Sequence, residues 1–246
     1  MRPRNLWLIA LGILAIPCTL VLFLPASLVT RYLPPGVTMG TLSGTVWNGA
    51  ADALAINGRP LGAVRWRILP SHLLHGRLGA DALLVNQDAS IQGKASLGLG
   101  NSLRLSNVEG RWPIAALPLS ALPPGWTGDV QVSMVDLSLE SGAVARVLGN
   151  LELHNLREPS SMQLGSYRVT FDEESRQGDS VVGRFQDLEG PMAVSGTITL
   201  GNDRSYVIDG LVAARATAPP SMAERLRYLG SPDAQGRRPF SVAGTY

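Results

Sequence analysis

The chain has 246 residues, with 21 lysines and arginines against 19 aspartates and glutamates, and its formal net charge is +2. This near balance excludes a strongly basic nucleic-acid-binding surface, although the sequence pI is close to 9.0. The only cysteine, Cys18, cannot form a disulfide within the chain, so the fold must depend on a hydrophobic core. The 27 glycines and 17 prolines are typical of many short strands joined by tight turns.

The first apolar run, from Leu6 to Leu24, contains no charged residue. About 20 apolar residues in a helix cross the hydrocarbon core of a bilayer, and Arg2 and Arg4 before the run predict a cytoplasmic N-terminus. A cleavable signal peptide has an apolar region of only about 7–15 residues. We therefore favour a retained anchor over a signal peptide. A lipoprotein is less favoured still, because Cys18 lies inside the run.

The run divides the chain into four predicted parts. They are a cytoplasmic tail (1–5), a transmembrane anchor (6–26), a juxtamembrane connector (27–36) and a periplasmic β domain (37–246). We expect the β domain to be a Gly-rich, mostly antiparallel, curved sheet with one or two short helices. The proline-rich stretch around 113–127 marks a candidate boundary between two half-sheets.

Alternation of apolar and polar residues predicts the strands of the first half. Asn57-Gly58 is a two-residue hairpin signal, because both residues accept positive φ. In the strand that follows, Val64 and Trp66 share one face while Arg65 and Arg67 share the other. Further strands are predicted at 77–84, 89–99 and 103–112, with a helical turn at 71–75 and another near 116–122.

The second half continues the same pattern, with strands expected at 128–139, 143–154, 163–171, 181–185, 192–200 and 205–216. The apolar parity changes between Met134 and Val135, which predicts a β-bulge. Ser221 is a candidate N-cap for a helix over 222–229, with Glu224 completing a capping box. A last strand over 239–246 would place Phe240, Val242 and Tyr246 on the core side.

The sequence singles out no residue for catalysis or metal binding. His72 and His75 lie on one side of a helical turn, but they lack a third ligand at zinc-site spacing. The acidic run 172–174 lacks the pattern of a calcium loop, and a solvated hairpin loop explains it better. No nucleophile elbow, zinc-protease motif or phosphate loop occurs. We therefore assign no catalytic, cofactor-binding or metal-binding residues and expect no enzyme activity.

One stretch carries a family resemblance. It is Gly44-Thr45-Val46-Trp47-Asn48-Gly49, then Trp66, then Leu69-Pro70 with Leu73, Leu74 and Gly76 at fixed spacing, and it resembles type II secretion system protein N. The tail around Gly236 is similar to the same family. The motif residues Gly44, Trp47, Asn48, Gly49, Trp66, Pro70, Leu74, Gly76 and Gly236 are expected to be structural. We expect Trp47 and Trp66 to pack in the core, with Gly49 and Gly58 at turns.

The resemblance implies an accessory component of the type II protein secretion machinery. Such a component would be anchored in the bacterial inner membrane and would act through contacts with other inner-membrane secretion components in the periplasm. A remoter similarity to AsmA-like proteins implies an alternative, a periplasmic β-groove that binds or transfers lipid. A hydrolase held by a signal anchor is the third reading.

Overall fold

The computed structural model describes residues 19–70, 77–87, 89–98, 100, 102–116, 125–160 and 162–246. Within them, the strands of the first half are β1 (Val37–Met39), β2 (Leu42–Gly44), β3 (Asn48–Ile56), β4 (Arg59–Leu69), β5 (Leu78–Asn86), β6 (Ala89–Gly98) and β7 (Ser102–Pro113). Those of the second half are β8 (Thr127–Glu140), β9 (Ala143–Arg157), β10 (Gln163–Phe171), β11 (Arg176–Gln177), β12 (Ser180–Glu189), β13 (Met192–Leu200), β14 (Ser205–Ala214) and β15 (Arg238–Thr245). The helical segments are η1 (Ala26–Tyr32), η3 (Ile114–Ala116), η4 (Glu173–Ser175), α2 (Pro220–Leu226) and η5 (Arg227–Leu229).

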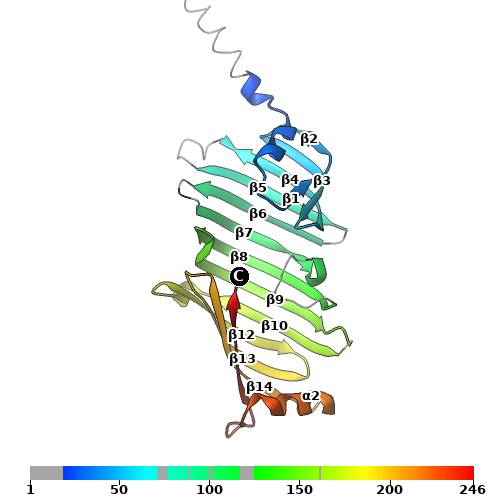
Figure 1. Ribbon diagram of the computed structural model, residues 1–246, viewed down its shortest axis with the longest axis vertical. Coiled ribbons are helices and arrows are strands. Elements are labelled where there is room, and N and C mark those ends of the chain that lie inside the picture. The colour runs from blue at the N-terminus through cyan, green and yellow to red at the C-terminus, as the bar shows by residue number, and fades with distance from the viewer. Residues whose placement is uncertain are drawn as a thin grey trace, which may run out of the picture.

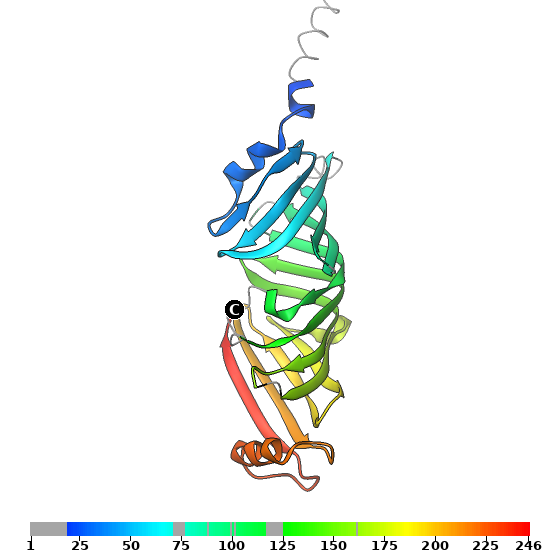
Figure 2. The same cartoon turned by 90° about the vertical axis from the view of Figure 1, so that its right-hand side faces the viewer.

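These fifteen strands of the described chain form one sheet, so the expected mainly β, antiparallel architecture is confirmed. Almost every strand pairs with its neighbour in sequence, and the main path runs from β1 and β3 through to β15. The strands lie across the long axis of the molecule over most of its length, and the sheet is curved when seen from the side (Figures 1 and 2). On either side of the proline-rich stretch 113–127, β7 and β8 are direct neighbours in this sheet.

The strand register gives the sheet one apolar face and one polar face. Successive cross-strand partners on the apolar face form an unbroken row, here called the apolar row: Ala51, Val64, Leu84, Ile91, Gly110, Val132, Leu151, Val169, Phe185, Gly196, Gly210 and Phe240. The row one residue away, from Arg65 through Gln92, Glu109 and Asn150 to Ser241, is largely polar. The core clusters lie on the apolar face and centre on Trp112, Val130 and Val181.

Aromatic rings cover glycines on neighbouring strands. A Cβ added at Gly183 would lie 2.5 Å from the Phe171 ring, and one at Gly244 would lie 2.7 Å from the Tyr206 ring. Phe185 and Phe240 cover Gly196 and Gly210 in the same way, and their ring centroids are 6.1 Å apart. A ring that lies flat on a glycine restores the apolar contact that the missing side chain cannot supply. The high glycine content therefore serves packing within the sheet as well as turns.

The curvature of the C-terminal half is held by contacts between two hairpin turns. The Arg204 guanidinium, between β13 and β14, donates to the Ser141 carbonyl, between β8 and β9, at 2.8 Å. The Tyr246 hydroxyl donates to the Gly201 carbonyl at 3.0 Å and accepts from the Val144 N–H at 3.2 Å. The bond between Val144 and Tyr246 joins β9 to the end of β15, and four strands lie between these two on the sheet path, so the last strands curl back over the sheet (Figure 1).

Several local predictions are confirmed. Asn57 and Gly58 have φ of 51° and 77° and join β3 to β4 as a tight hairpin. The β8–β9 register shifts between Met134 and Asp136, so Val135 is bulged out, with 56% of its surface exposed.

The predicted capping box of the C-terminal helix is wrong. Helix α2 begins at Pro220, directly after the N-cap Pro219, and no side chain caps it. Proline at the first helical position lacks the N–H that a cap would otherwise satisfy, which explains why Ser221 lies inside the helix instead of before it.

The predicted membrane anchor is only partly within the described residues. The Phe23 N–H donates to the Thr19 carbonyl at 3.1 Å, the spacing of an α-helical turn. In the portion of the chain that is described, no helix is long and apolar enough to cross a membrane. Most of the predicted span, residues 6–18, lies outside the described residues, as does the predicted helical turn at 71–75.

Candidate functional site at the junction with the sheet

The family motif forms a tight corner between β2 and β3. The Thr45 N–H donates to the Asn48 carbonyl at 3.0 Å, and the Asn48 N–H donates back to the Thr45 hydroxyl at 3.1 Å. Gly44 begins the corner with φ of 83°, where a Cβ would lie 2.4 Å from the Asn48 carbonyl oxygen. Glycine is therefore required by both the backbone conformation and the space at this position.

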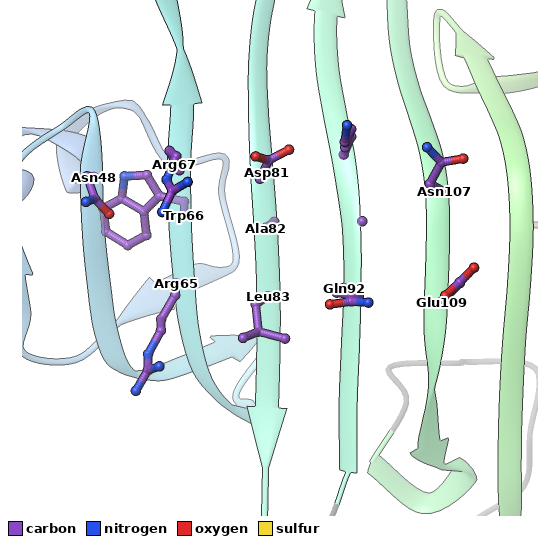
Figure 3. A pocket seen from close by; sticks show the side chains of 12 residues that line it. Asn48, Arg65, Trp66, Arg67, Asp81, Ala82, Leu83, Gln92, Asn107 and Glu109 are labelled. Atoms are coloured by element: carbon purple, nitrogen blue, oxygen red, sulfur yellow. The ribbon is translucent and has the colours of Figure 1, made fainter.

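Trp66 reaches from β4 across to β3 and closes the corner. Its ring lies over Gly49, where an added Cβ would be only 2.4 Å from the ring atom Cζ2. Its indole N–H donates to the Val46 carbonyl at 2.9 Å. Figure 3 shows the ring spanning the two strands beside Asn48. The glycine thus makes room for the ring, and the ring supports the corner.

Trp47 points the other way and holds the segment that ends the apolar N-terminal run. Its indole N–H donates to the Val21 carbonyl at 2.7 Å. Next to it, the Val46 N–H donates to the Leu24 carbonyl at 2.9 Å, and Pro25 forms an isolated β-bridge with Thr45. The motif therefore fixes residues 21–25 to the first strands of the sheet. We call this set of contacts the junction.

The structure corrects two expectations about the motif. Trp47 and Trp66 are half-buried and not core residues. Gly49 lies within β3 under an indole ring and not at a turn. The W-N-G motif marks this region in the sequence. The contacts of Trp47 with Val21 and of Gly49 with Trp66 are not predictable from the motif, because these partners lie far away in sequence.

The remaining motif residues are not part of the junction. Pro70 directly follows β4, whereas Leu74 and Gly76 lie outside the described residues. Gly236 lies at the opposite end of the sheet, in a turn before β15, where its N–H donates to the Asp233 carbonyl at 2.9 Å. The Arg237 N–H donates to the Asp233 carboxylate in this turn and lowers the pKa of that group.

A shallow hollow of about 500 Å³ lies near the junction, on the polar face of β4 to β7 (Figure 3). Arg67, Asp81 and Lys94 are successive cross-strand partners there, and Arg65 and Glu109 lie in the next row. Charges of both signs alternate across the hollow and offset one another. The arrangement therefore selects neither an anion nor a cation, and it contains no nucleophile paired with a base.

The histidines and acidic residues do not assemble a metal site in the part of the chain that is described. There, no group of three or more His, Cys, Asp or Glu side chains is placed to hold an ion. The His154 ring lies 3.0 Å from the Glu152 carboxylate on β9, and the same carboxylate forms an ion pair with Arg168. In the acidic run, Asp172 accepts from the Glu174 N–H at 3.1 Å and caps η4. His72 and His75 lie outside the described residues.

Comparisons with known proteins place the chain in a family. Residues 35–241 match the family model for type II secretion system (T2SS) protein N. The chain is 27% identical to the type II secretion system protein N of Vibrio cholerae serotype O1 over 237 residues, and the match covers 92% of each chain. It is 26% identical to the protein of the same description from Aeromonas hydrophila, again over 92% of each chain. No solved structure matches the chain significantly. Because the family model covers most of the sequence, the chain belongs to the type II secretion system protein N family.

Proposed function

We propose that this protein is an inner-membrane-anchored, non-enzymatic component of the type II secretion machinery that holds its β domain in the periplasm and contacts other secretion components there. The observation that carries the proposal is the junction, which lies in a chain of this family. The junction binds the end of the apolar N-terminal run directly to the first strands through Trp47 and Val46. A domain on a free tether would not need such bonds.

The elongated sheet suits a component that reaches from the membrane toward its partners. Its main path contains thirteen strands. At about 4.8 Å per strand, these extend for about 55–60 Å along the sheet. Because the first strands are bonded to the N-terminal segment, the far end with α2 and β15 would project away from the membrane (Figures 1 and 2). Contacts with partners would then be made along the sheet and at its far end.

Export and topology test this proposal together. A strain that lacks the gene should export a type II substrate less efficiently, and the full chain should restore export. A variant in which a cleavable signal peptide replaces residues 1–24 should reach the periplasm but fail to restore export. A periplasm-dependent reporter fused after Tyr246 should be active. Normal export without the gene would refute the secretion role, and full rescue by the cleaved form would refute the anchor.

The apolar row supports a second candidate function, the binding of lipid. A sheet face of this kind is normally covered by a second layer, yet Val64, Leu84, Val132 and Leu151 of the row are only half-buried. The row runs across every main-path strand from β3 to β15, so acyl chains could lie along it. Its polar opposite face would remain in water.

Adjacent residues on opposite faces make this alternative testable. A photo-crosslinking amino acid at Leu151 would lie on the apolar row, whereas one at Asn150 would lie on the polar face of the same strand. In cells labelled with radioactive phosphate, lipid binding predicts phospholipid adducts from position 151 and few from position 150. Equal yields at the two positions would refute a lipid-binding face.

A further inference from the structure

The last strand leaves one edge of the sheet open. β15 pairs with β14 over eight consecutive residues without a register shift, and no other strand of the described chain pairs with it. From Pro239 to Tyr246 the sequence carries no charge. Edge strands are usually protected by charges, bulges or short length, because unpaired backbone groups attract other strands. Apart from Arg238 and Pro239 at its start, β15 has none of these devices.

The alternation of hydrogen bonds along β15 shows which of its backbone groups point away from β14. The Tyr246 N–H donates to the Arg204 carbonyl at 3.0 Å, so even-numbered residues of this strand point toward β14. In an antiparallel ladder the bonded residues alternate. The N–H and C=O groups of Ser241, Ala243 and Thr245 therefore point outward from the sheet.

The opposite edge is blunted, so the open edge is a specific feature of β15. There, β1 and β2 have only three residues each and are interrupted at Gly40 and Thr41. The segment η1 also packs against β2 and β3 at this end. Such short, interrupted and partly covered strands cannot accept a long added strand.

We propose that the free edge of β15 binds an extended segment of a partner polypeptide, which adds a strand to the sheet. Outward N–H and C=O groups that alternate along a strand are satisfied by another extended backbone. Phe240 ends the apolar row, and Val242, which is 49% exposed, lies on the same face. The added segment would therefore place apolar side chains on that face and small or polar ones on the other.

The partner is another protein and not a second copy of this chain. β15 runs roughly along the long axis of the molecule (Figures 1 and 2). A symmetric antiparallel pair of β15 edges would turn the second molecule upside down and place its N-terminal segment at the far end. Two copies paired in this way could not both be anchored in one membrane. This step rests on the anchoring in the proposed function.

Position-specific crosslinking in cells with the full-length chain tests the edge. A photo-crosslinking amino acid is placed at Ser241 or at Ala243, and the crosslinked peptides are identified by mass spectrometry. Thr197 is the matched control, because it is exposed on the same face two strands inward, in the same cross-strand row as Ser241. We expect positions 241 and 243 to crosslink to one short segment of one protein, at sites about two residues apart, and position 197 to give no such product.

A proline variant shows whether the crosslinked partner is hydrogen-bonded to β15 as an added strand or only lies close to it. Ala243→Pro removes one outward N–H and leaves the bonds to β14 intact, so the melting temperature should hardly change. The crosslink from position 241 should fall about tenfold or more, because the partner loses one hydrogen bond and keeps an unsatisfied acceptor. The neighbouring change Val242→Pro removes an inward N–H and should lower the melting temperature instead.

Each other outcome would overturn the proposal. Products that join two β15 strands would identify a second copy as the occupant. Equal yields at 197 and 241, or a yield that survives Ala243→Pro, would show that no strand is added. Export is measured separately with the unmodified chain, so a failed secretion role remains distinguishable from a failed edge.

Discussion

Gly49→Ala isolates the packing on which the junction depends. The backbone of Gly49 is not in the left-handed region, so alanine meets no conformational penalty there. Its Cβ would, however, lie 2.4 Å from Cζ2 of Trp66 and 2.8 Å from the Thr45 carbonyl oxygen. The indole must then move, and its N–H would lose the 2.9 Å bond to the Val46 carbonyl.

The cost follows from three effects of known size. Overpacking at a tight contact costs about 1–3 kcal/mol, and the lost indole hydrogen bond costs about 1 kcal/mol. Replacing glycine by alanine also stabilises the protein by about 0.4–1 kcal/mol, because it lowers the conformational entropy of the unfolded chain. We therefore expect a net loss of about 2–3 kcal/mol. For a domain of this size this corresponds to a melting temperature lower by about 4–12 °C.

A double-mutant cycle with Trp66→Ala tests the cause. Urea unfolding of the full chain in detergent is followed by circular dichroism for the two single variants and for the double variant. Without the indole, Gly49→Ala should cost clearly less, because only the contact with the Thr45 carbonyl oxygen remains, which gives a coupling energy of about 1–2 kcal/mol. If the two changes are additive, the ring does not constrain this glycine and the packing argument for the junction fails.

Three further predictions concern other parts of the chain. Trp47→Phe should lower the free energy of unfolding by only about 0.5–1.5 kcal/mol. It should nevertheless speed hydrogen exchange in residues 19–25, because the indole hydrogen bond to the Val21 carbonyl is lost; unchanged exchange would contradict the junction. Burial and the nearby Asp187 raise the pKa of Tyr167 to about 12. The contribution of this group to native stability should therefore be constant below pH 10 and fall by up to about 2–3 kcal/mol between pH 10 and 12; Tyr167→Phe should remove that loss in urea titrations at each pH. Ser221→Ala should change the melting temperature by less than about 2 °C, because a serine that caps no helix contributes less than about 0.5 kcal/mol to the free energy of unfolding. A destabilisation above about 1 kcal/mol would show that Ser221 does cap the helix.

Much of the fold could be predicted because its determinants are local. Alternation over a few residues specifies a strand, and Asn57-Gly58 specifies a hairpin, regardless of the rest of the chain. Even the bulge at Val135 is visible as a change of parity, since one extra residue reverses the faces that follow it. Strands that pair with their sequence neighbours need no long-range information to find their order.

The errors have a common origin in contacts that local pattern does not encode. The junction pairs Trp47 with Val21 and Trp66 with Gly49, across 26 and 17 residues, and only the folded chain brings them together. Alternation alone also cannot say that the strands form one sheet and not two packed layers. Trp112 is buried in the core, whereas Trp47 and Trp66 are only half-buried.

The continuous sheet fixes the position of one end of the molecule relative to the other. Because each strand of the meander is bonded to the next, the direction of β3 and β4 relative to the N-terminal segment determines where β15 lies. The junction sets that direction at one end, and the open edge is exposed at the other, eleven strand spacings from β3 along the path. A change at Gly49 or Trp47 should therefore redirect the far edge without unpairing β15 from β14. A loss of partner contact in such variants, with the β14–β15 ladder intact, would follow from misplacement of the edge.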